Sequence, residues 1–120
     1  MLDVFNRMRR AGIVMGVGTD TIGEWSRTVP DSFIKELNWY VQGGYTNMEA
    51  LKAATLINAN LLDMGDKLGS LEAGKLADVI VVDGRPDENL DDLRKIDVVM
   101  KDGHVLIQSG LLVTTRHDQQ

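Results

Sequence analysis

The sequence predicts an α/β protein that forms the end of a larger fold, and three observations support this. Residues 13–17 are a short apolar run without alternation, typical of a strand buried on both faces of a parallel sheet. Helical patterns flank this run, and strand signals dominate after residue 66. A single buried strand needs neighbours along both edges, so we expect other polypeptide, or further copies of this chain, to cover it.

Two helices are predicted around that strand. The first covers residues 4–11 and ends at Gly12, because glycine readily adopts the left-handed conformation that ends helices. After a loop over 22–30, the second begins at a cap on Asp31 or Ser32 and ends at the Gly-Gly pair 43–44. The apolar positions on one face of this second helix are Phe33, Leu37, Tyr40 and Val41.

A capping box marks the next helix. Thr46 stands at the cap position and Glu49 three residues later, so each side chain can bond the other residue's backbone N–H. We expect this helix to run through residue 55, with a further helical stretch over 58–64 that Gly65 ends.

The second half of the chain has the features of a β-structure. Residues 68–75 are turn-like, and residues 78–83 are rich in β-branched side chains, which favour strands. The Asp-Gly pair at 102–103 lies between apolar runs and predicts a hairpin with a type I′ turn. We therefore expect one strand among helices over 1–65, mostly strands over 66–113, and a disordered tail over 114–120.

Composition excludes several classes of function. The 120 residues are 43% hydrophobic and 26% charged, which is ordinary for a soluble domain. A net charge of −5 argues against binding nucleic acid or an anionic membrane, because both require a basic face. The absence of cysteine removes disulfides and thiolate chemistry. No apolar run approaches the length of a membrane span, and we expect a soluble, cytoplasmic protein.

Asp20 is the candidate catalytic residue. It follows the predicted buried strand, and active sites of α/β barrels lie at the carboxyl ends of their strands. Its carboxylate could bind a metal or take a proton from metal-bound water. The alternative is a structural role, since aspartate often caps a turn through nearby backbone N–H groups.

Other motifs give little support for chemistry. His104 and His117 lack the spacing of a zinc site. The segment 69–75 has the glycine and lysine spacing of a phosphate-binding loop, but it leads into a strand and lacks Ser or Thr after the lysine. The acidic cluster 87–92 lacks the ligand spacing of a calcium loop. No histidine is placed by the sequence to activate a serine.

Several short motifs, taken in order, make the chain resemble the C-terminal part of metal-dependent amidohydrolases, with the imidazolonepropionase-like and Xaa-Pro dipeptidase-like branch as the nearest. These motifs are AGIVMGVGTD at 11–20, Glu36-Leu37, Tyr40-Val41, Gly43-Gly44, Tyr45-Thr46, EALKAAT at 49–55, LGSLEAGKLAD at 68–78 and VMKDG at 99–103. The resemblance covers roughly residues 4 to 110.

The resemblance implies the last strand and helices of a (β/α)₈ barrel over 1–65, followed by strands of a small β-sandwich over 66–113. It implies a divalent metal, usually zinc, whose bound water attacks an amide, peptide or cyclic amide C–N bond of a small molecule. Asp20 would contact the metal and shuttle the proton. The family's other ligands have no counterpart in this chain, so we expect the isolated chain to bind no metal and to be inactive.

A non-catalytic assembly module derived from the same fold is the alternative function. We expect the chain to form homo-oligomers or to associate with the rest of the barrel. The substrate, and the identity and number of the metals, stay open.

Overall fold

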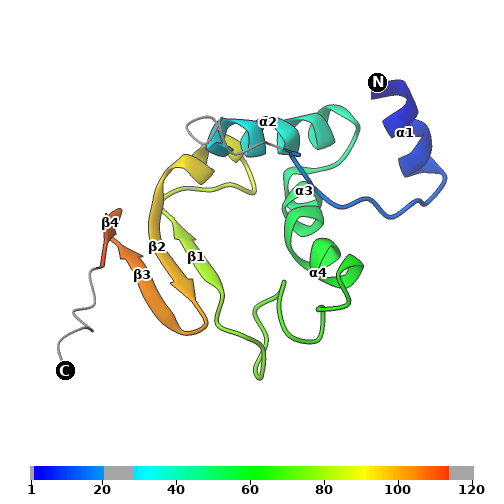
Figure 1. The fold of residues 1–120 in the computed structure, drawn as a ribbon. Helices are drawn as coiled ribbons and strands as arrows, with labels where there is room; N and C mark the ends of the chain where they lie inside the picture. Colours follow the sequence, from blue (N-terminus) through cyan, green and yellow to red (C-terminus); the bar gives the residue numbers. More distant parts are fainter. Residues whose placement is uncertain (1, 21–28, 114–120) are drawn as a thin grey trace.

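The computed structural model describes residues 2–20 and 29–113, which form an α/β structure with the helices at one end and a sheet at the other (Figure 1). The helical elements are α1 (Leu2–Arg10), α2 (Val29–Gln42), α3 (Asn47–Lys52), the π-helix η2 (Ala53–Ile57), α4 (Asn58–Leu61) and the 3₁₀-helix η3 (Leu90–Arg94). The strands are β1 (Val79–Val82), β2 (Ile96–Lys101), β3 (His104–Gln108) and β4 (Leu111–Leu112).

The segment that follows α1 is irregular. α1 ends at Arg10, one residue before the predicted end, and Gly12 has a φ of +74°. The strand predicted over 13–17 does not form, because a strand is defined by backbone bonds to a neighbour and no described strand lies beside it. Residues 13–20 instead pass along the helices without regular structure (Figure 1).

α2 contributes more buried apolar residues than any other described element, namely Ile34, Leu37 and Tyr40. It begins at Val29, so the prediction of a cap on Asp31 or Ser32 was wrong, and its first flanking position lies outside the described residues. Leu37 is fully buried and Tyr40 nearly so, as the helical pattern predicted. Phe33 is 37% exposed, because the buried face turns towards Ile34 instead.

The predicted capping box opens α3. The Thr46 hydroxyl accepts a bond from the Glu49 N–H (3.2 Å), and the Glu49 carboxylate accepts one from the Thr46 N–H (2.7 Å). The helix continues through the π-turn of η2 into α4, which ends at Leu61 and not at the predicted Gly65.

The sheet is a four-stranded antiparallel meander in the order β1-β2-β3-β4. Asp102 and Gly103 both have positive φ (+48° and +77°), which confirms the predicted type I′ hairpin. β4 was not predicted, although Ser109 and Gly110 repeat the same pair of positive φ values (+52° and +71°). The Asp78 carboxylate accepts a bond from the Asp102 N–H (2.8 Å), which ties the start of β1 to the hairpin turn.

One core joins the helices to η3, the 3₁₀-helix between β1 and β2. Its buried members are Val17, Leu37, Tyr40, Ala50, Ala53 and Leu90. Leu90 belongs to η3, so this core includes residues from both sides of position 65. An ion pair between Arg94 and Asp31 also links η3 to α2. The described strands contribute no buried residue.

Candidate active-site segment

Asp20 lies at the end of the irregular segment that crosses the helices. Its backbone has a φ of +49°, which is uncommon for a residue other than glycine, and its side chain is exposed. The segment 21–28 that follows it lies outside the described residues. Among the described residues, those that precede Asp20 place it through their contacts with the helices.

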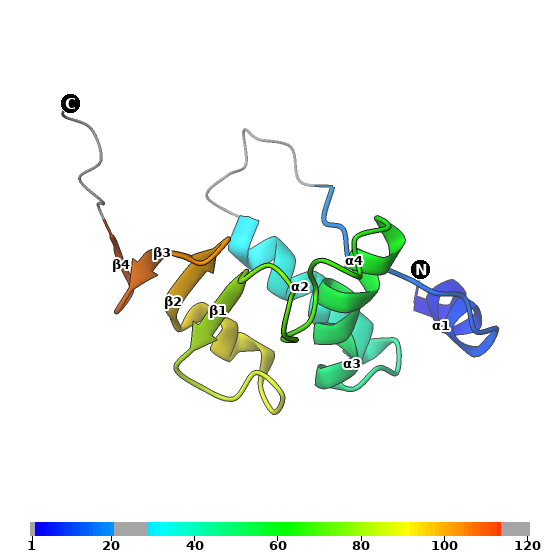
Figure 2. The ribbon, with the colours of Figure 1, turned by 90° about the horizontal axis from the view of Figure 1, so that it is seen from below.

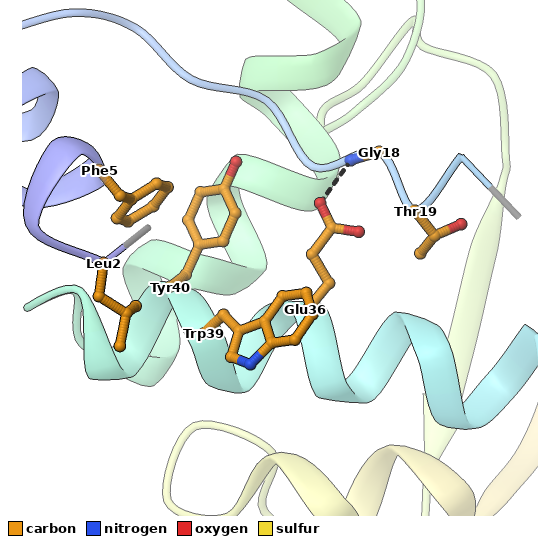
Figure 3. A pocket seen from close by; sticks show the side chains of 7 residues that line it. All are labelled: Leu2, Phe5, Gly18, Thr19, Glu36, Trp39 and Tyr40. Carbon is orange, nitrogen blue, oxygen red and sulfur yellow. Dashed lines mark hydrogen bonds between the residues drawn. The ribbon is translucent and has the colours of Figure 1, made fainter.

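Three side chains from the helices bond consecutive backbone groups of that segment. The Tyr40 hydroxyl donates to the carbonyl of Gly16 (2.5 Å), and the Asn58 amide nitrogen donates to the carbonyl of Val17 (2.8 Å). The N–H of Gly18 donates to the Glu36 carboxylate (2.8 Å; Figure 3). Tyr40 and Glu36 stand on α2, whereas Asn58 begins α4.

An open pocket of about 270 Å³ lies between α1, α2 and this segment. Figure 3 shows the residues that line it, which are Leu2, Phe5, Gly18, Thr19, Glu36, Trp39 and Tyr40. Burial, with a smaller contribution from Glu36, raises the pKa of Tyr40 to about 12. The Tyr40 hydroxyl therefore stays protonated at neutral pH and remains a hydrogen-bond donor.

The described residues do not by themselves fit a catalytic metal ion. Such a site normally uses three protein ligands, and no group of three or more His, Asp or Glu side chains gathers within residues 2–20 and 29–113 in a way that could hold an ion. His104 is exposed in the β2–β3 hairpin, with its ring nitrogen 3.0 Å from the Asp102 carbonyl, and His117 lies outside the described residues. Asp20 is thus the one predicted ligand, and it belongs to no such group in the described part of the chain.

The other candidate motifs have structural partners. The Lys75 ammonium group bonds Ser70 (2.5 Å) and Glu72 (3.1 Å), which agrees with a turn and not with a phosphate site. Asp87 and Glu88 of the acidic cluster both pair with Arg85.

Sequence reasoning did not identify Glu36 and Asn58 as functional candidates, and it assigned Tyr40 only to the apolar helix face. The bonds of these three residues to the segment span 18 to 41 positions in sequence, so no local pattern indicates them. One signal was present, because Glu36 and Tyr40 both belong to the motifs that carry the family resemblance.

Comparison with known proteins identifies the class. The profile described as "Amidohydrolase family" matches residues 2–106. The imidazolonepropionase of Geobacillus sp. (strain WCH70) is 34% identical over 105 residues, which cover 85% of this chain and 24% of that protein. The 5-methylthioadenosine/S-adenosylhomocysteine deaminase of Symbiobacterium thermophilum is 35% identical over 86 residues, 64% of this chain and 19% of that protein.

Solved structures agree with the sequence relatives. The crystal structure of a Xaa-Pro dipeptidase with methionine in its active site superposes with a TM-score of 0.73 at 36% identity, over 87% of this chain and 25% of that one. Molinate hydrolase gives a TM-score of 0.73 at 26% identity, over 86% of this chain and 25% of that one. The chain belongs to the amidohydrolase family, a family of metal-dependent hydrolases.

The chain spans about a quarter of the length of the curated relatives it matches. None of the helices in the described ranges is long and apolar enough to cross a membrane.

Proposed function

We propose that this chain supplies the C-terminal segment of a metal-dependent amidohydrolase that hydrolyses a C–N bond of a small amide, peptide or cyclic amide. In this proposal residues 1–65 end a (β/α)₈ barrel and residues 66–113 belong to a small β-sandwich. The metal, expected to be zinc, supplies an activated water when bound. The other ligands come from polypeptide outside this chain, and the isolated chain is inactive.

The observation that carries the proposal is the family match across residues 2–106, which includes Asp20 within the segment 11–20. Asp20 would contact the metal centre and move the proton. The described residues alone do not fit the metal, so we assign no other catalytic role to them. The names of the relatives support C–N bonds as the target, since they include an imidazolonepropionase and a deaminase. We expect the assembled enzyme to be cytoplasmic and oligomeric.

A chimaera tests the proposal directly. This chain would replace the matched quarter of the Geobacillus relative, and turnover of that relative's substrate and bound metal would be measured. We expect a metal-loaded, active chimaera, whereas the isolated 120-residue chain should show neither stoichiometric zinc nor hydrolysis. A folded chimaera without activity, or stoichiometric zinc on the isolated chain, would contradict the proposal.

A second candidate function is a non-catalytic assembly module. The observation that favours it is the row of apolar side chains that the strand register places across the sheet, namely Ile80, Val99, Ile107 and Leu112. Ile80 is 53% exposed and Leu112 72% exposed, whereas an apolar row of this kind is normally covered by another layer of structure. The solution mass of the isolated chain tests this candidate, with Leu112→Lys as the variant and Gln108→Lys, at an exposed position on the other face of the sheet, as a control. A stable oligomer that Leu112→Lys dissociates would support it, and a monomer at high concentration would argue against it.

A further inference from the structure

We propose that Glu36, Tyr40 and Asn58 are positioning residues that hold the backbone of residues 16–18 and thereby place Asp20. This inference rests on the proposed function, because it concerns the residue that would contact the metal. The three side chains touch the backbone that leads to Asp20, and they act on the reaction only through it.

The pattern of hydrogen bonds supports this role. In a strand, neighbouring backbone satisfies the N–H and C=O groups, whereas here side chains take that part for three consecutive residues. The partners come from α2 and α4, two helices that approach the segment independently. The buried side chain of Val17 adds an apolar anchor between the three polar contacts.

The packing around Gly16 is a second, independent observation. A Cβ atom at Gly16 would lie 2.1 Å from Oδ1 of Asn58 and 2.8 Å from Cδ1 of Leu61, so only glycine leaves room for the Asn58 amide. A Cβ atom at Gly18 would meet no heavy atom within 4 Å. The segment therefore fits closely against α4 at the residue next to the Asn58 contact and has open space two residues later.

The chemistry of each contact predicts which substitutions keep it. Gln can accept the Gly18 N–H as Glu36 does, whereas Ala cannot. Asp in place of Asn58 would set a carboxylate against the Val17 carbonyl, two acceptors without a donor. Phe in place of Tyr40 removes the donor while it keeps the ring, which packs against Phe5 with centroids 4.8 Å apart.

The first test measures the contact itself in the 120-residue chain. Hydrogen exchange of the Gly18 amide, followed by NMR, should be slow in the wild type and in Glu36→Gln, and at least tenfold faster in Glu36→Ala. Asn60→Ala, an exposed asparagine on the same helix as Asn58, is the matched control and should leave the rate unchanged. A wild-type Gly18 amide that exchanges as fast as an unstructured peptide would overturn the inference without any variant.

The second test measures catalysis in the chimaera. We expect Glu36→Ala, Asn58→Asp and Gly16→Ala each to lower kcat on the order of 10- to 100-fold with little change in KM, because a small displacement of a catalytic group costs this much. Glu36→Gln should recover most of kcat. Thermal unfolding followed by circular dichroism identifies any variant that fails to fold. If one does, the exchange rate of the Gly18 amide in the 120-residue chain decides whether the contact forms.

Failure of this inference can be distinguished from failure of the proposed function. If the chimaera is active, Asp20→Asn abolishes turnover and the Glu36 and Asn58 variants keep a normal kcat, the positioning role is wrong and the function stands. If Asp20→Asn keeps full activity, the function fails, and a protected Gly18 amide then shows only a structural contact.

Discussion

The helical region and the sheet are stabilised in different ways. Leu37, Ala50 and Ala53 are fully buried among the helices, whereas the described strands contain no buried residue and expose Ile80, Val81 and several leucines. Figure 1 and Figure 2 show the cause, because the sheet lies beside the helices and β4 extends away from them. Backbone ladders and surface ion pairs such as Lys101–Asp78 hold the strands together, without a core of their own.

This contrast indicates which part of the chain needs a partner. The helices already bury an apolar stripe, but a sheet normally packs one face against another layer. The irregular segment that ends at Asp20 is intermediate, because helical side chains satisfy part of its backbone although no neighbouring strand does.

Loss of a core side chain from the helical region should change the free energy of unfolding most, and a matched loss from the sheet should change it little. Leu37→Ala should lower the free energy of unfolding by about 3 kcal/mol, because truncation of a fully buried leucine leaves a cavity. Val81→Ala, at a position 47% exposed in β1, should change it by less than about 0.5 kcal/mol. Urea unfolding followed by circular dichroism measures both, and equal effects would show that the sheet is buried in solution.

A smaller effect is expected at the helix cap. Thr46→Ala should cost about 1 kcal/mol of unfolding free energy, because the Glu49 N–H loses its acceptor at the start of α3. Thr46→Ser keeps a hydroxyl and serves as the control in the same unfolding measurement. An unchanged stability in Thr46→Ala would mean that the capping box does not form.

The smallest expected effect is a dependence of stability on pH through the Glu49 carboxyl. Hydrogen bonds from the Thr46 backbone and hydroxyl hold the pKa of the Glu49 carboxyl below its ordinary value. A lowered folded-state pKa stabilises the fold above the ordinary pKa of glutamate, and this contribution is lost as the pH falls through the folded-state value. NMR titration of Glu49 should show the lowered pKa in the wild type and a partial rise in Thr46→Ala, which loses the hydroxyl bond but keeps the backbone N–H. The same pKa in both proteins would mean that the hydroxyl does not contribute to the shift.

Local signals in the sequence predicted much of the fold. The capping box at Thr46 and the Asp102-Gly103 turn each depend on a few adjacent residues, and both are present. The strand over 13–17 was predicted from a short apolar run without alternation, but strand formation depends on a partner strand that no local pattern can supply.

The candidate site was predicted only at Asp20, whose role stays a proposal. The contacts that hold its segment come from Glu36, Tyr40 and Asn58, at sequence separations of 18, 24 and 41 residues. Contacts of this kind depend on how helices pack, and a polar residue within a helix pattern does not reveal which backbone it will bond.

The turnover number of the chimaera with Asp20→Asn tests the central claim most directly. The substitution keeps the size of the side chain and removes its charge and its capacity to take a proton. The proposed role predicts a loss of kcat on the order of 10²- to 10⁴-fold, as for removal of a general base. Asp66→Asn, an exposed aspartate beyond α4, is the control and should leave kcat unchanged. A chimaera with Asp20→Asn that turns over at the rate of the unsubstituted chimaera would contradict the catalytic role and favour a module that only supports assembly.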